Sequence, residues 1–189
     1  LDKILILYAP ITMFSLLSVA LLAKPLVFSW VDVSYRSSVP IVQFLVLCNF
    51  FAFISYPLGM LLVAKQRIRE MFFINWLIPL IFWIGILVSK NYFEERSFAI
   101  FKLISFFIMA VVYYRFLLRF LNISLVNSLK RYIFATFPSV LFLISFYFIS
   151  KDWFVFEKSI KNLIIVTFIM GGVFSFSLLI HYFTSSNFR

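Results

Sequence analysis

The chain has 189 residues, of which 64% are hydrophobic, 22% aromatic and 13% charged, with a formal net charge of +10. A soluble domain is about half apolar and about a quarter charged, and one of this size leaves much of its chain on the surface. This composition therefore excludes a soluble globular protein and predicts an integral membrane protein. The 17 Lys and Arg residues are scattered between apolar segments, which argues against a nucleic-acid partner and favours roles in topology and lipid contact.

Six apolar segments are long enough, at about 20 residues each, to cross a bilayer as helices. In chain order they cover residues 4–23, 39–64, 71–89, 98–121, 132–150 and 163–183. We therefore expect an all-α fold, a polytopic transmembrane bundle of about six spans that forms a single transmembrane domain. The chain begins with Leu1 and shows no signal-peptide pattern, so we expect it to be a piece of a longer polytopic protein.

The first span is uncharged until Lys24, and the pair Lys24 and Pro25 is expected to end it or to bend it. A polar loop at residues 32–38 follows, flanked by Trp30 and Tyr35, which are residues of the kind that lies at membrane interfaces. Asp32 is the one acid near a possible pathway, and the simpler interpretation is a solvated loop residue.

The second and third spans carry amide side chains and helix breakers at membrane depth. The amides are Gln43, Asn49 and Asn75, and helix kinks are expected at Pro57, Gly59 and Pro79. Breaks in a membrane helix persist only where protein or a water-filled cavity satisfies the freed backbone groups. The pattern therefore indicates either a polar pathway or ordinary packing kinks between helices.

The fourth span is interrupted by charge. Only residues 103–114 are uncharged, which is roughly 18 Å of helix and too short for a hydrocarbon core. Lys102 or Arg115 must therefore reach into the membrane, snorkel to the interface or face a cavity. Residues 115–131 mix basic and apolar side chains, as is typical of an interfacial amphipathic segment. Gly171 and Gly172 in the last span would allow close helix packing.

The sequence predicts no catalytic residue, no metal site and no cofactor. A Ser-His-Asp arrangement, an HExxH motif, a phosphate-binding Gly-rich loop and a CxxC pair are all missing from it. Cys48 is the single cysteine and His181 the single histidine, and both are expected to be packing residues in apolar spans. We therefore expect that the chain is not an enzyme.

The stretch LLAKPLVFSWVDVSYRSSVPIVQFLVLCNFFAFISYPLGMLLVAKQRIREMFFINWLIPLIF resembles the later half of bacterial polysaccharide flippases. These are the O-antigen, or lipid-linked oligosaccharide, translocases of the multidrug/oligosaccharidyl-lipid/polysaccharide exporter superfamily. The features that carry the resemblance are a span ending in a small residue and Pro-Leu at residues 23–26, a loop with Tyr and small residues at 35–38, a basic turn at 64–67, and Asn75 in the next span. Val31 and Asp32 depart from the usual Leu-Gly or Phe-Gly pair.

The resemblance implies a C-terminal part of a transporter of about 12 to 14 spans that works by alternating access in the bacterial cytoplasmic membrane. Its implied partners are an undecaprenyl-pyrophosphate-linked oligosaccharide, membrane lipids and a missing N-terminal lobe of the same protein. Because pyrophosphate attracts cations, the resemblance implies Lys102 and Arg115 in the substrate pathway, with Gln43, Asn49 and Asn75 as its polar lining.

Other classes of membrane protein stay open at this point. The alternatives are a fragment of an O-antigen polymerase or of a membrane acyl- or glycosyltransferase, another exporter of the same superfamily, or an anchor bundle without transport. Such enzymes are expected to carry a large extracytoplasmic loop with Arg, His or acidic clusters, whereas the longest loop candidate here has 17 residues, 115–131. An anchor bundle would lack the kinks and amides of the second and third spans.

Overall fold

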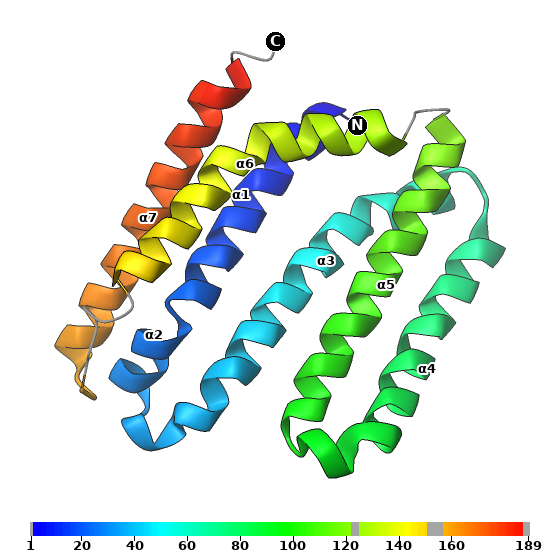
Figure 1. The fold of residues 1–189 in the computed structure, drawn as a ribbon. Coiled ribbons are helices and arrows are strands. Elements are labelled where there is room, and N and C mark those ends of the chain that lie inside the picture. Colours follow the sequence, from blue (N-terminus) through cyan, green and yellow to red (C-terminus); the bar gives the residue numbers. More distant parts are fainter. Residues whose placement is uncertain (1, 122–124, 151–156, 187–189) are drawn as a thin grey trace. The chain divides into compact units, whose positions relative to one another are not determined.

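The computed structural model describes residues 2–121, 125–150 and 157–186, and every regular element in them is a helix (Figure 1). The helices are α1 (Asp2–Leu21), α2 (Ala23–Trp30), the short 3-10 helix η1 (Val33–Ser37), α3 (Ser38–Ala64), α4 (Ile68–Phe93), α5 (Arg96–Leu121), α6 (Leu125–Ser150) and α7 (Ile160–Ser186). Each of the six expected spans coincides with one of the long helices. The expectation of an all-α fold is confirmed.

Within the described residues, four helices are long and apolar enough to cross a membrane, and five if the bent pair α1–α2 counts as one span. The described apolar part of α6, Phe134–Ser150, is shorter. The chain is therefore a multi-pass membrane protein built as a helical bundle. That it crosses the membrane six times stays a prediction.

The helices form two compact units, which are described separately below. Unit 1 contains residues 1–43 and 126–189, and unit 2 contains residues 44–125. Unit 1 thus holds α1, α2, η1, the first residues of α3, and α6 and α7. Unit 2 holds the remainder of α3 together with α4 and α5.

Unit 1 is centred on an apolar cluster of Phe14, Leu143 and Val173, which come from α1, α6 and α7. The apolar chain α1–α2 bends by 60° at the break between Leu21 and Ala23. Pro25 lies in the first turn of α2, where the missing N–H of proline leaves no helical bond unmade. The bend therefore lies at Leu22, two residues before the expected pair Lys24 and Pro25, and α2 continues through both of these residues.

Unit 2 is dominated by the antiparallel hairpin of α4 and α5. Gly85 is buried in α4 against the ring of Phe101 in α5, and a Cβ atom added to Gly85 would overlap that ring. One turn nearer the hairpin end, the Ser97 hydroxyl donates to the carbonyl of Ser89 at 3.2 Å. A small residue at position 85 therefore lets the two helices approach closely.

The turn between α3 and α4 is a Schellman motif without its usual glycine. Gln66 has a φ of 58°, and its N–H donates to the carbonyl of Val63 at 2.9 Å. The N–H of Arg67 reaches back to the carbonyl of Leu62, also at 2.9 Å. These two bonds satisfy carbonyls that the helix end leaves open, and the basic residues of the turn lie at the negative end of the α3 dipole.

Candidate functional site

Three helices of unit 2 meet at a polar contact between Asn75 and Tyr113. The Tyr113 hydroxyl donates to Oδ1 of Asn75 at 3.3 Å, which joins α5 to α4. A Cβ atom on Gly59 of α3 would lie 3.5 Å from the same hydroxyl, so Gly59 packs against it. The Asn75 side chain is exposed whereas Tyr113 is buried. The contact therefore presents an amide at the surface of the unit and anchors it from within.

An apolar cluster surrounds this contact. It consists of Leu62 from α3, Ile74 from α4 and Met109 from α5, packed with the Tyr113 ring. Asn75 was predicted as a polar lining residue, but Tyr113 was not. A tyrosine in an apolar span gives only a weak signal, because Tyr is common as a packing residue and its partner is 38 residues away.

Lys102 lies well inside α5, about 9 Å along the axis from the first residue of that helix. The Cys48 thiol of α3 donates to the carbonyl of Lys102 at 3.9 Å, which brings this part of α5 beside α3. The Lys102 side chain is half-buried, and its Nζ lies 5.9 Å from the ring centroid of Phe98, one turn nearer the start of α5. The side chain therefore runs back towards the nearer helix end, as a snorkelling lysine does.

Arg115 lies at the opposite part of α5 and is exposed. Thirteen residues separate it from Lys102, which is roughly 20 Å along one helix. The two predicted pathway cations are thus held far apart within unit 2 and do not form one binding site.

Gln43 has a structural partner in unit 1. Its Nε2 donates to the carbonyl of Ala20 at 3.0 Å. Ala20 is in the last turn of α1, where the carbonyl groups have no donor within the helix. The amide of Gln43 therefore caps α1 just before the bend at Leu22 and stabilises that bend.

Asn49 is exposed on α3, and its Nδ2 donates to the carbonyl of Leu45 one turn earlier at 3.0 Å. This local bond satisfies one donor of the amide. Like Asn75, Asn49 exposes an amide from the part of a helix that is otherwise apolar.

The three expected kink positions fall inside continuous helices. α3 extends through Pro57 and Gly59, and α4 extends through Pro79. The side chain of Pro57 lies outside the described part of the chain. Bends at these positions stay predictions.

His181 serves helix packing in unit 1. Its Nδ1 lies 3.0 Å from the carbonyl of Ala135 in α6, and its ring meets Phe14 edge-on with centroids 5.7 Å apart. One turn along the same interface, the Ser139 hydroxyl donates to the carbonyl of Ser177 at 2.9 Å. Within the described residues no group of three or more His, Cys, Asp and Glu side chains could hold a metal ion.

Asp32 caps η1 outside the apolar spans. Its Oδ1 accepts from the N–H of Ser34 at 2.9 Å, and the side chain is exposed. That backbone hydrogen bond lowers the pKa of the Asp32 carboxyl, with further help from the Ser34 side chain and from Lys158. Asp32 is therefore an ionised cap of a solvated loop.

Comparison of the chain with protein-family models, with curated proteins and with solved structures finds no match.

Proposed function

We propose that this chain forms one helical lobe of a flippase that moves an undecaprenyl-pyrophosphate-linked oligosaccharide across the bacterial cytoplasmic membrane. The proposal has two supports: the resemblance over residues 23–70 and the amides exposed along the apolar helices. The observation that carries it is the contact of Asn75 with Tyr113, which holds an exposed amide at membrane depth.

An exposed amide is unfavourable in contact with hydrocarbon and favourable beside water or a polar ligand. Asn75 is held by a buried tyrosine, so its side chain does not have to turn towards its own backbone as Asn49 does. Amide and phenol groups form the hydrogen bonds that sugar hydroxyls need. A glycan in a water-lined pathway beside α3 and α4 would satisfy the exposed amides of Asn49 and Asn75.

The two cations of α5 then serve different stages of transport. Lys102 reaches towards the end of unit 2 at which α5 begins, and Arg115 lies near the opposite end. A pyrophosphate group would meet one cation where it enters the pathway and the other where it leaves. Two lobes that alternate in access would carry it between them, and the second lobe is the N-terminal part that the resemblance implies. The substrate moves without chemical change.

The test is glycan export in cells that depend on the full-length protein. Asn75→Leu and Lys102→Ala are expected to reduce surface glycan about tenfold, which corresponds to roughly 1.4 kcal/mol. Lys90→Ala is the matched control, because it removes an exposed cation at the end of α4 and should leave export unchanged. Membrane abundance is measured for each variant. Unchanged export by Asn75→Leu and Lys102→Ala at normal abundance would refute the proposal.

A further inference from the structure

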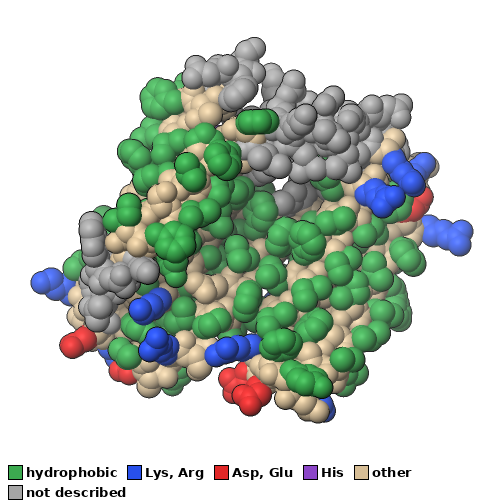
Figure 2. Space-filling view, in the orientation of Figure 1, with side chains coloured by type: hydrophobic (Ala, Val, Ile, Leu, Met, Phe, Trp, Pro, Cys, Tyr) green, Lys and Arg blue, Asp and Glu red, His purple; other side chains and the backbone are tan. Residues whose placement is uncertain are grey.

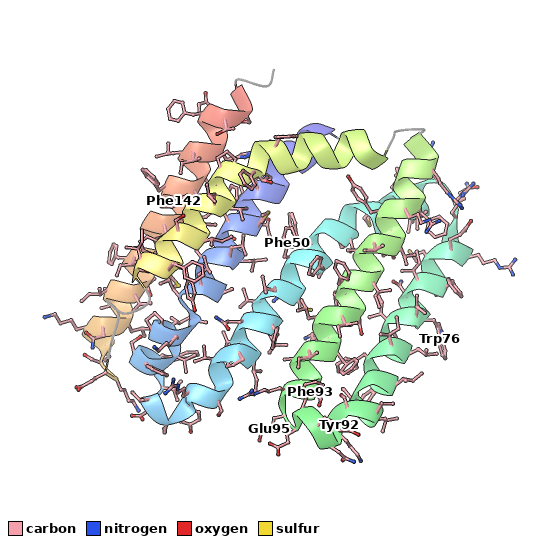
Figure 3. The ribbon with its side chains drawn as sticks, in the orientation of Figure 1. Phe50, Trp76, Tyr92, Phe93, Glu95 and Phe142 are labelled. Carbon is pink, nitrogen blue, oxygen red and sulfur yellow. The ribbon has the colours of Figure 1, made fainter. Side chains whose placement is uncertain are left out.

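One face of α4 carries an uninterrupted apolar stripe. Its members recur at the three- and four-residue spacing of a helix face, and all are exposed: Phe72, Phe73, Trp76, Leu80, Trp83 and Leu87. Trp76 points away from α5 (Figure 3). Arg69 and Lys90 lie on the same face beyond the two ends of the stripe, and both are exposed.

The length of this stripe matches a bilayer. From Arg69 to Lys90 the helix extends roughly 32 Å, and a hydrocarbon core is about 30 Å thick. The stripe is therefore the lipid-facing side of unit 2, and its two flanking cations lie at the level of the two headgroup layers.

The two ends of unit 2 differ in charge. The end near Arg69 carries five cations and one acid: Lys65, Arg67, Arg69, Arg115, Arg119 and Glu70. The end near Lys90 is less positive, with three cations and two acids: Lys90, Arg96, Lys102, Glu94 and Glu95. Figure 2 shows Lys and Arg side chains gathered beside an acidic one where α3 joins α4.

Packing brings the basic residues of α5 to the same end as the α3–α4 turn. Leu62, at the end of α3, packs in one cluster with Ile74 of α4 and Tyr113 of α5. Arg115 follows Tyr113 by two residues and Arg119 by one further turn, and both are exposed. Within the turn, Arg67 is 3.8 Å from Glu70, which leaves the end strongly positive.

We propose that this basic end of unit 2 binds anionic phospholipid headgroups, with the acyl chains lying along Phe72, Phe73 and Trp76. The cations supply the electrostatic attraction, and the aromatic side chains that follow Arg69 on the same face of α4 supply the apolar contact. A second copy of the chain fits this face less well, because a two-fold interface would bring the same cations together. The inference concerns the surrounding lipid and does not depend on the proposed transport.

Two tryptophans on the stripe provide the test. Trp76 is seven residues from Arg69, and Trp83 is seven residues from Lys90, so each reports on one end. Two single-tryptophan versions of the full chain, one retaining Trp76 and one Trp83, are reconstituted in phosphatidylcholine bilayers. Phosphatidylglycerol with brominated acyl chains is then added at low mole fraction, because bromine quenches only nearby tryptophan.

Brominated phosphatidylglycerol is expected to quench Trp76 more than Trp83, with an apparent selectivity over brominated phosphatidylcholine of about fivefold or more at Trp76. Arg69→Gln combined with Arg115→Gln should abolish that selectivity. The matched control, Lys90→Gln combined with Arg96→Gln, removes the same number of charges from the less positive end and should preserve the selectivity. Equal quenching of all versions by brominated phosphatidylcholine verifies that each is folded and inserted.

Three results would overturn the proposal. The first is equal quenching of Trp76 and Trp83 by brominated phosphatidylglycerol, and the second is selectivity that survives Arg69→Gln with Arg115→Gln. The third is displacement of the brominated lipid from Trp76 by undecaprenyl pyrophosphate but not by ordinary phosphatidylglycerol, which would make the surface a substrate site. Glycan export is a separate readout: its loss would concern the proposed transport and would not change the conclusion on lipid binding.

Discussion

The hydroxyl of Tyr113 donates a hydrogen bond to Oδ1 of Asn75 at 3.3 Å, across 38 residues of chain. The bond joins the two helices of the α4–α5 hairpin and holds an exposed amide at membrane depth. Gly59 of α3 packs against the same hydroxyl. This contact therefore links the stability of unit 2 to its candidate function. Its contribution to stability and its contribution to transport can be measured separately.

A double-mutant cycle measures the energy of this bond. Tyr113→Phe removes the donor, and Asn75→Leu removes the acceptor. Interhelical hydrogen bonds in membrane proteins contribute about 0.6 kcal/mol on average, so we expect a coupling energy near that value. The measurement is the free energy of unfolding of both single variants and of the double variant in mixed micelles with increasing SDS. Strictly additive effects would show that the bond does not form.

Gly85→Leu is expected to destabilise the α4–α5 hairpin by about 1 to 3 kcal/mol, because the new side chain overlaps the ring of Phe101. Replacing the ring as well, in Gly85→Leu with Phe101→Ala, should recover a large part of that loss. Gly171→Leu in α7 is the matched control: contrary to the close packing expected at Gly171 and Gly172, no neighbouring atom lies within 4 Å of a Cβ atom added at either glycine. If Gly171→Leu is as destabilising as Gly85→Leu under SDS unfolding, the close approach at Gly85 is not the cause.

Gln66→Gly is expected to stabilise unit 2. The left-handed conformation of Gln66, with a φ of 58°, costs a residue with a side chain about 1 to 2 kcal/mol, and glycine adopts it readily. Gln66→Val should be destabilising, because β-branched residues tolerate this conformation least. Thermal unfolding in detergent compares the three proteins. A midpoint that falls in Gln66→Gly would contradict the Schellman geometry of the turn.

The Asp32 carboxyl is expected to titrate below its ordinary pKa of about 3.9, because the N–H of Ser34 donates to its ionised form. A lowered pKa in the folded state stabilises η1 above the unfolded pKa, and this contribution is lost as the pH falls through the folded value. Ser34→Pro removes the backbone donor and should raise the pKa of Asp32, whereas Ser38→Pro leaves the donor in place. NMR titration of the carboxyl carbon measures both, and an unchanged pKa in Ser34→Pro would exclude the cap.

The helices could be predicted from the sequence because apolar length alone nearly determines them in a membrane. The expected span 39–64 is α3 (Ser38–Ala64) almost residue for residue. The expected span 71–89 ends earlier than α4, which continues through Lys90 to Phe93, because interfacial residues can extend a helix beyond the hydrocarbon core.

The contacts between helices could not be predicted in the same way. In the α6–α7 pair, Ser139 contacts Ser177, and Ala135, four residues earlier, contacts His181, four residues later. One register satisfies both contacts, and side-chain packing between the two helices favours it. The sequence pattern does not show that packing. For the same reason Asn75 was predicted as a polar residue without its partner Tyr113, and Gln43 without its role as a cap of α1.

Sidedness of the turns at the two ends of α4 tests the membrane topology most directly. Cys48 is buried and is replaced by alanine, and single cysteines are then introduced as Gln66→Cys and as Glu94→Cys, at exposed positions. In sealed vesicles of one orientation, an impermeant maleimide added outside should label one of the two cysteines and reach the other only after permeabilisation. Labelling of both cysteines from the same side of intact vesicles would contradict a membrane-spanning α4 and the bundle that is built around it.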